Sequence, residues 1–394
     1  MKEKIIFVNN NMDIGGVQKS LVNLLKSIES EYEITLLLFS KSGEYIEEIP
    51  KSVEVVTCDS LFRCLGISQN ESKKNLFVFL SRGFLALVTK ILGRKYAMKF
   101  ILHSQKRLAE EYDCAISFLQ NGGNKSFYGG CNEFVIEKIN AKKKIAFLHC
   151  DYRNCGSNTN YNNRLYERFD RIAACSEGCR KSFIDVMPKL EKKCYTVINC
   201  HDFKNIQELS KINTVNYSED CINIVSVSRI SNEKGIDRAI EAIKYVNDKK
   251  INIKYYIVGD GVLRPKIEQK IQEYGLSETI FLCGNHKNPY SFMRNADILF
   301  IPSYHEAAPL VIDEARCLGV PVLSTDTTSA QDMVLNRKIG WVCGNSQSEI
   351  NTMLLRIISD PDMIKEYKKN MALKICDNKE AVDQFKALIN SNDC

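Results

Sequence analysis

The sequence predicts an α/β protein built from two Rossmann-like parallel-sheet domains that face a central cleft. Short apolar segments typical of buried strands alternate with helical patterns, and this alternation occurs twice along the 394 residues. Strands that alternate with helices form parallel sheets covered by helices. A polar stretch over residues 199–220 separates the two series. We therefore expect a first domain over residues 1–198, a second over 199–375, and a final segment, 376–394, whose helix could cross back to the first domain.

The first series opens with a strand, a glycine loop and a helix over residues 17–28. The other strands expected in this half are also short apolar runs, with helical stretches between them. The expected strands of the first series span residues 4–10, 33–39, 112–119, 142–149, 171–176 and 194–199.

The second series restarts at residue 222. Its expected strands span residues 222–228, 253–259, 279–284, 297–303 and 321–325, and its expected helices span 236–246, 263–274, 289–296 and 309–318. The last helix has the clearest ends, because Pro309 suits a first helical position, Gly319 suits the position just past the last turn, and Pro321 prevents continuation. Its side chains are apolar nearly all round, so we expect it to be buried between layers.

The composition is that of a globular chain rather than a disordered or fibrous one, with 44% hydrophobic and 26% charged residues. No apolar run approaches the ~18 residues that span a bilayer, so we expect a cytoplasmic protein. The sixteen cysteines include no C-x-x-C pair, and we expect most of them to be reduced, buried and structural. The closest pairs, Cys150 with Cys155 and Cys175 with Cys179, lack the spacing of a zinc site.

The net charge of +6 is concentrated in one region. Between Glu71 and Glu110 the chain carries nine basic residues and no acidic one: Lys73, Lys74, Arg82, Lys90, Arg94, Lys95, Lys99, Lys106 and Arg107. These charges are interleaved with apolar runs, which predicts one or two basic amphipathic helices over residues 72–109 that could lie on an anionic membrane surface. An ordinary helix pair with a basic solvated face is the alternative. Nucleic acid is not an expected partner, because no binding motif occurs there.

Two loops after predicted strands carry residues suited to binding phosphate, since ligands of parallel sheets lie beyond the carboxyl ends of the strands. Gly15 and Gly16 precede a helix, where the backbone can approach an anionic group closely, although a plain tight turn explains this pair equally well. In the second half, Arg229 and Lys234 follow a strand, and Gly235 leads into the next helix. A guanidinium and an ammonium could together neutralise a diphosphate without a metal ion, whereas an ordinary basic surface loop is the alternative.

Two further loops carry carboxylates and a histidine. Glu306 precedes the helix of residues 309–318, and Glu314 lies within it, eight positions further on. At about 1.5 Å rise per residue the two are at most roughly 12 Å apart, so they would meet opposite ends of an extended ligand. A buried Glu314 requires hydrogen-bond donors, which two ribose hydroxyls could supply. His149, followed by Asp151, ends a strand of the first half. A packed side chain and a functional side chain are equally good interpretations of His149.

The second half resembles the glycosyltransferases of family 4, glycosyl transferases group 1, which have the two-domain GT-B fold and transfer a sugar from a nucleotide diphosphate sugar with retention of anomeric configuration. The resemblance rests on the segments VSRISNEKGI, YYIVGDGVLR, IFLCGN and NADILFIPSYHEAAPLVIDEARCLGVPVLSTD, in this order and spacing. It covers residues 222–344 and, more weakly, the glycine loop and FLHCDY of the first half. The two carboxylates with an upstream Arg and Lys are specific to it, whereas GDG alone is not.

The resemblance implies a role for each of these positions in the second half. Glu314 would bind the ribose hydroxyls, and Glu306 would lie near the transferred sugar. Arg229 and Lys234 would hold the diphosphate, assisted by backbone amides at the start of the helix. Those amides are the ones of Leu310 and Val311.

The resemblance also places residues around the rest of the donor. Residues near Cys283 and Gly284 would lie against the nucleotide base, and Gly15 with Gly16 would close over the phosphates. His149 would lie on the acceptor side of the donor sugar. The catalytic candidates are thus Glu306, His149, Arg229 and Lys234.

Two features restrict what the resemblance implies. Family members commonly have glycine after the first carboxylate, where this chain has Ala307 and Ala308. If that position requires φ > 0, alanine reshapes the sugar pocket, so donor preference is open, with a UDP-sugar favoured over a GDP-sugar. The first half, where the acceptor binds, matches more loosely, so acceptor and linkage cannot be inherited.

The expected function is a retaining, hexosyltransferase-type glycosyltransferase that acts on a saccharide acceptor, lipid-linked, in bacterial capsule, lipopolysaccharide or exopolysaccharide synthesis. Fixed cations and helix-end amides would stabilise the charge that builds on the leaving phosphate, and front-face attack would retain the anomeric configuration. Neither a metal ion nor another cofactor is expected. The only D-x-D, residues 360–362, contains Pro361 and is typical of a helix cap. The carboxylate spacing does not suit the pair of a retaining glycosidase, which lies ~5 to 5.5 Å apart.

Other functions compatible with this sequence belong to different classes. A nucleotide-sugar epimerase of the same two-domain architecture would need no acceptor. A non-catalytic protein that binds sugar nucleotides would bind the donor without turnover. An NAD-dependent dehydrogenase is disfavoured, because no G-x-G-x-x-G follows the first strand.

Overall fold

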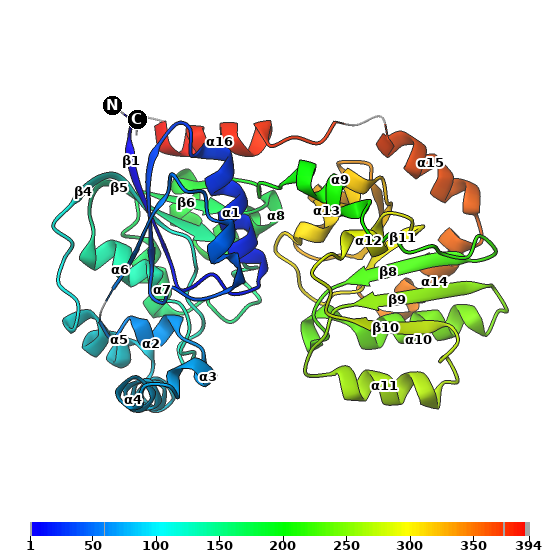
Figure 1. Cartoon of the computed structure of the whole chain (residues 1–394), viewed down its shortest axis with the longest axis horizontal. Helices are drawn as coiled ribbons and strands as arrows, with labels where there is room; N and C mark the ends of the chain where they lie inside the picture. Colours follow the sequence, from blue (N-terminus) through cyan, green and yellow to red (C-terminus); the bar gives the residue numbers. More distant parts are fainter. Residues whose placement is uncertain (1, 59, 373–374, 391–394) are drawn as a thin grey trace. The chain divides into compact units, whose positions relative to one another are not determined.

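The chain forms two compact α/β units in a computed structural model, which describes residues 2–58, 60–372 and 375–390 (Figure 1). The first unit comprises Met1–Cys200 and Asn378–Cys394, and the second comprises His201–Asp377. Each unit contains one parallel sheet with helices packed against it. The predicted class, two Rossmann-like parallel-sheet domains, is confirmed. The division between the units falls within a few residues of the boundaries expected at 198 and 375.

The first unit is built on a seven-stranded sheet in the order β3-β2-β1-β4-β5-β6-β7. All neighbouring strands in it are parallel. The strands are β1 (Lys4–Asn9), β2 (Glu33–Leu38), β3 (Glu54–Thr57), β4 (Glu111–Ser117), β5 (Asn140–Leu148), β6 (Arg171–Ala174) and β7 (Cys194–Thr196). The interior strand β1 is buried from Ile5 onwards, as its continuous apolar run requires when both faces of the sheet are covered.

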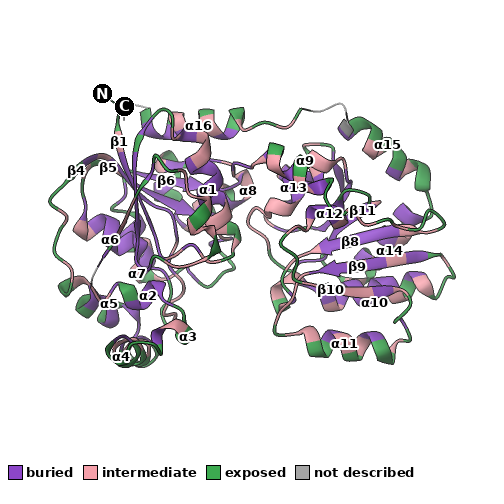
Figure 2. Ribbon diagram, in the orientation of Figure 1, coloured by how far each residue is buried: buried purple, intermediate pink, exposed green. Residues whose placement is uncertain are grey.

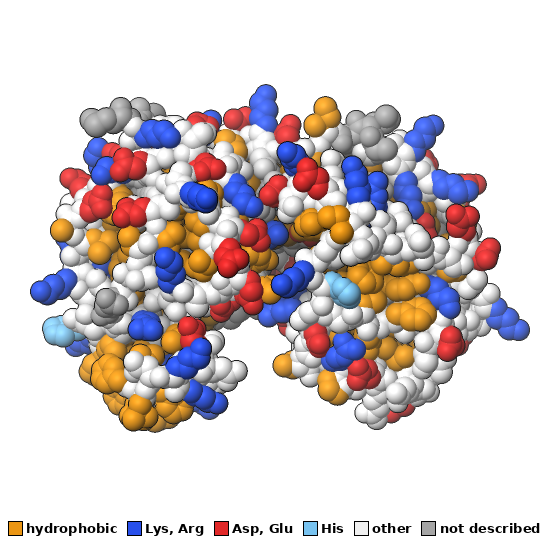
Figure 3. Space-filling view, in the orientation of Figure 1, with side chains coloured by type: hydrophobic (Ala, Val, Ile, Leu, Met, Phe, Trp, Pro, Cys, Tyr) orange, Lys and Arg blue, Asp and Glu red, His pale blue; other side chains and the backbone are white. Residues whose placement is uncertain are grey.

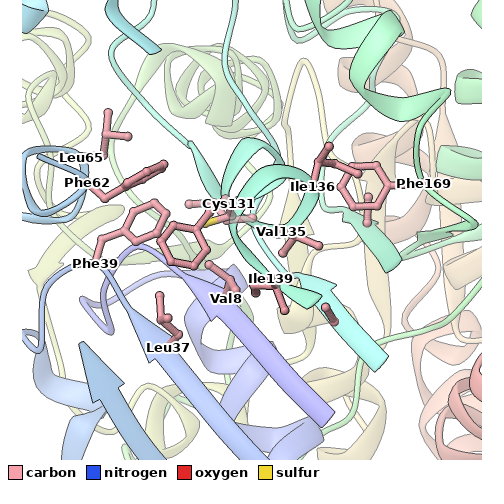
Figure 4. Packing of buried hydrophobic residues seen from close by; sticks show 14 of the residues in the cluster. Val8, Leu37, Phe39, Phe62, Leu65, Cys131, Val135, Ile136, Ile139 and Phe169 are labelled. Carbon is pink, nitrogen blue, oxygen red and sulfur yellow. The ribbon is translucent and has the colours of Figure 1, made fainter. Parts of the chain in front are cut away.

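Two apolar layers cover the first sheet. Helix α1 (Gly16–Ile28) and the last helix, α16 (Lys379–Asn390), contribute to one layer, in which the Phe385 and Phe7 rings stack with centroids 6.2 Å apart. In the other layer, Phe134 of α6 (Cys131–Lys138) packs against Phe39 and Phe62, which follow β2 and β3. Figure 4 shows Phe39 and Phe62 close to Cys131 of the same helix. The other helices are η1 (Glu44–Glu48), α2 (Arg63–Gly66), α3 (Gln69–Ser72), α4 (Leu76–Leu92), α5 (Arg94–His103), α7 (Asn160–Tyr166), α8 (Glu177–Val186) and η2 (Pro188–Lys193).

The second unit is built on a six-stranded parallel sheet in the order β10-β9-β8-β11-β12-β13. Its strands are β8 (Ile222–Val227), β9 (Ile253–Val258), β10 (Ile280–Gly284), β11 (Ile298–Ile301), β12 (Val322–Thr325) and β13 (Gly340–Cys343). Its helices are α9 (Phe203–Ser210), η3 (Asn232–Lys234), α10 (Ile236–Asn247), α11 (Arg264–Glu273), α12 (Tyr290–Met293), α13 (Leu310–Leu318), the π-helical turn η4 (Gln331–Leu335), α14 (Gln347–Ile358) and α15 (Pro361–Ala372). Helices α10 and α14 share one core with the sheet, and α12 and α13 share the other (Figure 2).

Several elements differ from the prediction. The edge strands β3 and β13 were not predicted, because each has only four residues, and β3 has no buried residue. The helix expected over 289–296 shortens to α12, which has four residues. The basic region agrees with the one or two helices expected there, since it forms α4 and α5, separated by Gly93 with φ 92°.

Candidate functional site

The second sheet reverses its strand order at β8, and this brings two loops next to each other. The chain runs outwards from β8 through β9 to β10, and then returns to the other side of β8 and continues through β11 and β12 to β13. In open parallel sheets ligands bind at such a reversal, beyond the carboxyl ends of the strands. The loops that follow β8 and β11 carry Arg229, Lys234 and Glu306. The candidate site therefore lies at this reversal.

A glycine allows these two loops to pack closely. Gly235, between η3 and α10, has φ 63°, in the left-handed region that favours glycine. A Cβ atom on it would lie 2.1 Å from the carbonyl oxygen of Pro302. The backbone N–H of Tyr304 also donates to the carbonyl of Glu233 at 2.8 Å. The two loops thus form one packed unit, and a larger residue at position 235 would separate them.

Lys234 and Glu306, which the resemblance assigns to different parts of a donor, form an ion pair. The Lys234 Nζ donates to Glu306 Oε1 at 2.7 Å, and the Ser303 hydroxyl donates to the same oxygen at 2.7 Å. The two charged side chains are only 20% and 10% exposed. Water screens such a sheltered pair less than a surface pair, so each charge holds the other in a defined position.

Arg229 has a different environment, because it lies on the surface. Its side chain is 78% exposed, and its guanidinium contacts the Glu233 carboxylate at 3.2 Å. The Ser231 hydroxyl donates to the same carboxylate at 2.7 Å. Exposed ion pairs contribute between nothing and about 1 kcal/mol, so Arg229 can turn from Glu233 to an anionic ligand at little cost.

Arg238, on α10, supports the loop that carries Glu306. Its buried guanidinium donates to the carbonyls of Pro302 at 3.1 Å and Ser303 at 2.9 Å, and to Oδ1 of Asn345 at 2.6 Å. The guanidinium carbon also lies 3.7 Å from the centroid of the Tyr304 ring. Sequence analysis missed Arg238. The available signal was a cation on the otherwise apolar face of this helix.

Helix α13 begins one residue later than predicted. Pro309 is its N-cap, with ψ 118°, and Leu310 is the first helical residue, so the assignment of Pro309 to the first helical position was wrong. The extended ψ of Pro309 keeps it out of the helix. Leu310 and Val311, both half-buried, occupy the first turn, whose amides lack partners within the helix by geometry. Gly319 ends the helix with φ 72°, as predicted.

Glu314 lies on the buried side of α13 and is 9% exposed. The Tyr290 hydroxyl, at the start of α12, donates to its Oε1 at 3.2 Å. Sequence analysis predicted a buried carboxylate that needs donors, but it did not identify Tyr290 as one of them. The role of Glu314 in binding ribose stays a prediction.

The residue before Glu314 is the centre of a buried ion cluster. Asp313 Oδ1 accepts from Arg316 at 2.9 Å and from Arg337 at 2.6 Å, and its Oδ2 lies 3.5 Å from His201 Nε2. Burial alone would raise the pKa of Asp313, but the hydrogen bond from His201 and the charges of His201, Arg337 and Arg316 hold this pKa well below its usual range. Asp313 therefore anchors α13 as a carboxylate, a role that sequence analysis missed.

The alanines that replace the family glycine are not strained by their backbone. Neither Ala307 nor Ala308 has a positive φ. The loop after Glu306 thus follows a path that L-residues adopt readily, and the φ > 0 requirement considered from the sequence does not arise here.

The end of β10, expected near a nucleotide base, is formed by Cys283 and Gly284. Gly284 has φ 77°, and its carbonyl accepts from the backbone N–H of Gly259 at 2.8 Å. The carbonyl of half-buried Cys283 lies 2.9 Å from Nε2 of His286. A role for this segment in base binding stays a prediction.

The three candidates of the first half all lie in the first unit. Gly15 is the N-cap of α1 and has an extended φ of −176°. A Cβ atom on Gly16 would meet no atom within 4 Å, so the space beside Gly16 is unfilled. The His149 ring lies 4.7 Å from the Phe118 ring and 5.8 Å from the Phe147 ring, and burial lowers its pKa to about 3. Its Nε2 is buried without a hydrogen-bond partner among the described residues. His149 is therefore a neutral imidazole at neutral pH.

Comparisons with known proteins define the class. Residues 210–389 match the sequence model of the family Glycosyl transferases group 1. An uncharacterized glycosyltransferase of Methanocaldococcus jannaschii is 24% identical over 261 residues, which cover 57% of this chain and 64% of the relative. An N-acetylgalactosamine-N,N'-diacetylbacillosaminyl-diphospho-undecaprenol 4-alpha-N-acetylgalactosaminyltransferase of Campylobacter jejuni is 24% identical over 376 residues, 91% of this chain and 90% of the relative. The crystal structure of Anabaena HepE in complex with UDP matches with a TM-score of 0.66 and 16% identity, over 98% of this chain and 99% of that one.

The two parallel-sheet units thus have the fold of the GT-B glycosyltransferases. Residues 210–389 thus resemble the glycosyl transferases group 1 family. The matched region contains the paired Lys234 and Glu306 and the buried Glu314.

Proposed function

We propose that the chain is a retaining, hexosyltransferase-type glycosyltransferase that moves a sugar from a nucleotide diphosphate sugar, preferably a UDP-sugar, to a saccharide acceptor in bacterial cell-surface polysaccharide synthesis. The observation that carries the proposal is the sheltered Lys234–Glu306 pair at the sheet reversal, followed eight positions later by buried Glu314. The name of the Campylobacter relative specifies transfer to a diphospho-undecaprenol-linked saccharide, and the HepE structure contains UDP. The former supports a lipid-linked acceptor, and the latter supports a nucleotide-sugar donor.

The charges of the site suit the departure of a nucleoside diphosphate. As the bond between the anomeric carbon and the phosphate oxygen breaks, negative charge develops on that phosphate. Lys234, held by Glu306, and Arg229, loosely held by Glu233, would stabilise this charge together with the amides at the start of α13. Such stabilisation requires no metal ion, and metal independence is part of the proposal. Attack from the face that the leaving group occupies, with the donor phosphate taking the acceptor proton, would retain the anomeric configuration.

A thermal-shift titration tests the donor site. UDP, GDP, ADP and their common sugar conjugates are added to the wild type, to Glu314→Ala and to the control Glu366→Ala, which removes an exposed glutamate of α15. A ligand at 100 times its Kd stabilises by roughly 2.7 kcal/mol, which such a scan resolves. We expect one nucleotide family to stabilise the wild type and the control but not Glu314→Ala. A failure of every nucleotide to shift the wild type would refute the proposed donor site.

We also propose that α4 and α5 bind the surface of an anionic membrane, where a lipid-linked acceptor would be located. Ten of the nineteen large apolar side chains that are exposed in the described part of the chain lie on these two helices: Leu76, Phe77, Phe79, Leu80, Phe84, Leu87, Ile91, Leu92, Tyr96 and Phe100. They form a continuous apolar surface over α4 (Figure 3). Large contiguous apolar patches on a protein surface mark interaction sites.

The charges around this patch favour an anionic partner. Helices α4 and α5 contain no acidic residue. Five exposed lysines flank the apolar patch: Lys73, Lys74, Lys90, Lys95 and Lys99. Arg94 does not belong to this set, although the charge pattern suggested it, because it is buried and bonded to Glu133 at 2.9 Å. Apolar side chains surrounded by lysines are typical of helices that lie in a lipid interface. Among the described residues, no helix is both long and apolar enough to cross a bilayer.

Sedimentation with vesicles tests this second proposal. We expect binding to vesicles that contain phosphatidylglycerol and weaker binding to pure phosphatidylcholine. Replacing the five flanking lysines by glutamine, or Phe77 and Phe84 by serine, should each reduce binding to the anionic vesicles. The control replaces five exposed lysines elsewhere by glutamine: Lys51, Lys125, Lys189, Lys211 and Lys287. Equal binding of the control and of both patch variants would show that α4 and α5 are not the membrane-binding surface.

A further inference from the structure

The loop after β5 brings two cysteine sulfur atoms into contact. The Sγ atoms of Cys150 and Cys155 lie 3.2 Å apart, in a hydrogen bond between the two thiols. A tight turn creates this proximity, because the carbonyl of Asp151 accepts the backbone N–H groups of Asn154 at 3.1 Å and Cys155 at 2.9 Å. The Asp151 carboxylate also accepts from Asn154 Nδ2 at 2.7 Å and from Ser182 at 2.5 Å, which fixes the turn against α8.

One of these two thiols differs from the other described cysteines in its access to solvent. Of the fifteen cysteines in the described part of the chain, nine are buried, which agrees with the structural role expected from the sequence. Cys155 alone among these fifteen is exposed, and Cys150 is partly exposed. A small reagent can therefore reach Cys155 directly, and Cys150 is its immediate neighbour.

The reactivity of the two thiols also differs. The hydrogen bond with Cys150 lowers the pKa of Cys155 to about 6, against the opposing effect of burial. The same hydrogen bond, with burial, raises the pKa of Cys150. Since the thiolate is the nucleophile, Cys155 is the attacking group at neutral pH, and Cys150 is the thiol that would resolve a mixed disulfide on Cys155.

We propose that Cys150 and Cys155 form a redox-active dithiol that reacts with low-molecular-weight disulfides and closes to an intrachain disulfide. The Cys155 thiolate attacks one sulfur of the small disulfide RSSR, which forms a mixed disulfide and releases RS⁻. Cys150 then loses its proton to RS⁻, and its sulfur displaces the second RS⁻ from Cys155. The protein loses two electrons, RSSR gains them, and two RSH form, one protonated by Cys150 and one by solvent. The two sulfur atoms need to approach from 3.2 Å to about 2.05 Å.

The same side chains do not form a metal site. Within residues 2–58, 60–372 and 375–390, no three His, Cys, Asp or Glu side chains are placed to hold a metal ion. A second pair, Cys175 and Cys179, is fully buried, with sulfur atoms 4.0 Å apart. Hydrogen bonding to Cys179 and burial raise the pKa of Cys175 well above its usual range. The second pair should therefore stay reduced and serves as an internal control.

The disulfide would close the loop that begins directly after His149. The redox reaction itself depends only on the two thiols, so it can be tested without knowledge of donor or acceptor. Failure of the glycosyltransferase proposal would leave it unchanged.

Peptide mapping tests the proposal. The intact protein is incubated with oxidised glutathione, its remaining thiols are blocked with iodoacetamide, and it is digested with trypsin without reduction. Cleavage after Lys144, Arg153 and Arg164 places Cys150 in peptide 145–153 and Cys155 in peptide 154–164. We expect a disulfide-linked pair of these two peptides that separates on reduction. Peptide 172–180, which contains both cysteines of the second pair, should show no oxidation.

Single variants test the order of the steps. Cys150→Ser should accumulate glutathione on Cys155 without a linked pair, and Cys155→Ser should leave Cys150 unreacted. Alkylation of wild-type Cys155 should be half-maximal near pH 6, the value set by its pKa of about 6. The proposal is overturned if the wild type retains glutathione on Cys155 without forming the linked pair. It is also overturned if peptide 145–153 is linked to peptide 172–180, or if alkylation is half-maximal near pH 9.

Discussion

Replacing Arg238 by methionine tests how the loop that carries Glu306 is held in place. Methionine keeps an unbranched apolar stem but removes the guanidinium. The carbonyls of Pro302 and Ser303 and the side chain of Asn345 then lose this donor. Because Arg238 is buried, water does not easily replace it.

The structure sets the size of this effect. A buried polar group that loses its hydrogen-bond partner costs about 1–3 kcal/mol, and the carbonyls of Pro302 and Ser303 are both buried, whereas Asn345 is exposed and can bond to water. These costs are not additive, because the loop relaxes once the first bond is lost. We therefore expect Arg238→Met to lower the free energy of unfolding of the second unit by roughly 3–5 kcal/mol. Arg238→Lys keeps the positive charge but not the planar set of guanidinium donors, so it should lower the free energy of unfolding by less than Arg238→Met does.

The single tryptophan provides the assay. Trp341 lies in the same hydrophobic cluster as α10, so its fluorescence in urea reports on the second unit. The control Lys244→Met removes a partly exposed ion pair with Asp248, the C-cap of the same helix, and should change stability by at most about 0.5 kcal/mol. If Arg238→Met unfolds within this margin of the wild type, the hydrogen bonds of Arg238 do not hold the loop. In a thermal-shift titration, Arg238→Met should also weaken nucleotide binding, since the loop positions Glu306 and, through it, Lys234.

Two further predictions concern buried charges. Arg94→Met should destabilise the first unit by about 3–5 kcal/mol, because Glu133 stays buried without its partner, and the double variant Arg94→Met/Glu133→Leu should recover most of this loss. Circular dichroism in urea measures both, and a double variant as unstable as the single one would contradict the pairing. Asp313→Asn should destabilise the second unit by roughly 2 kcal/mol at neutral pH. Because the folded-state pKa of Asp313 is depressed, its contribution is full above the unfolded value of about 3.9 and is lost as pH falls below it. The Trp341 unfolding curves of Asp313→Asn and wild type should therefore differ at about pH 5 and converge in acid.

Local sequence patterns predicted most of the fold. Strands such as β1 and β11 are buried on both faces, so a continuous apolar run identifies them. Helix α13 was recognised from Pro309 and Gly319, although it begins one residue later than expected. The edge strand β3 was missed, because an edge position requires little burial and leaves a weak apolar signal.

The residue types of the candidate site were also predictable, since a cation, a carboxylate and a glycine after a strand suit a phosphate-binding loop whatever surrounds them. The partners of those residues were not. The pairing of Lys234 with Glu306 joins positions 72 residues apart, and it exists only because β8 and β11 are neighbours in the sheet.

The sequence by itself determined the class of fold, the resemblance of the second half to a glycosyltransferase family and the candidate residues, because these depend on local periodicity and on motifs within single loops. The tertiary structure decided which charged and reactive side chains a ligand or reagent can reach. It buried Arg94 against Glu133, left Arg229 exposed, and brought Cys150 against Cys155 through a turn that the sequence did not reveal. Burial and contact between side chains depend on how distant segments pack, and packing sets the protonation and reactivity of each group.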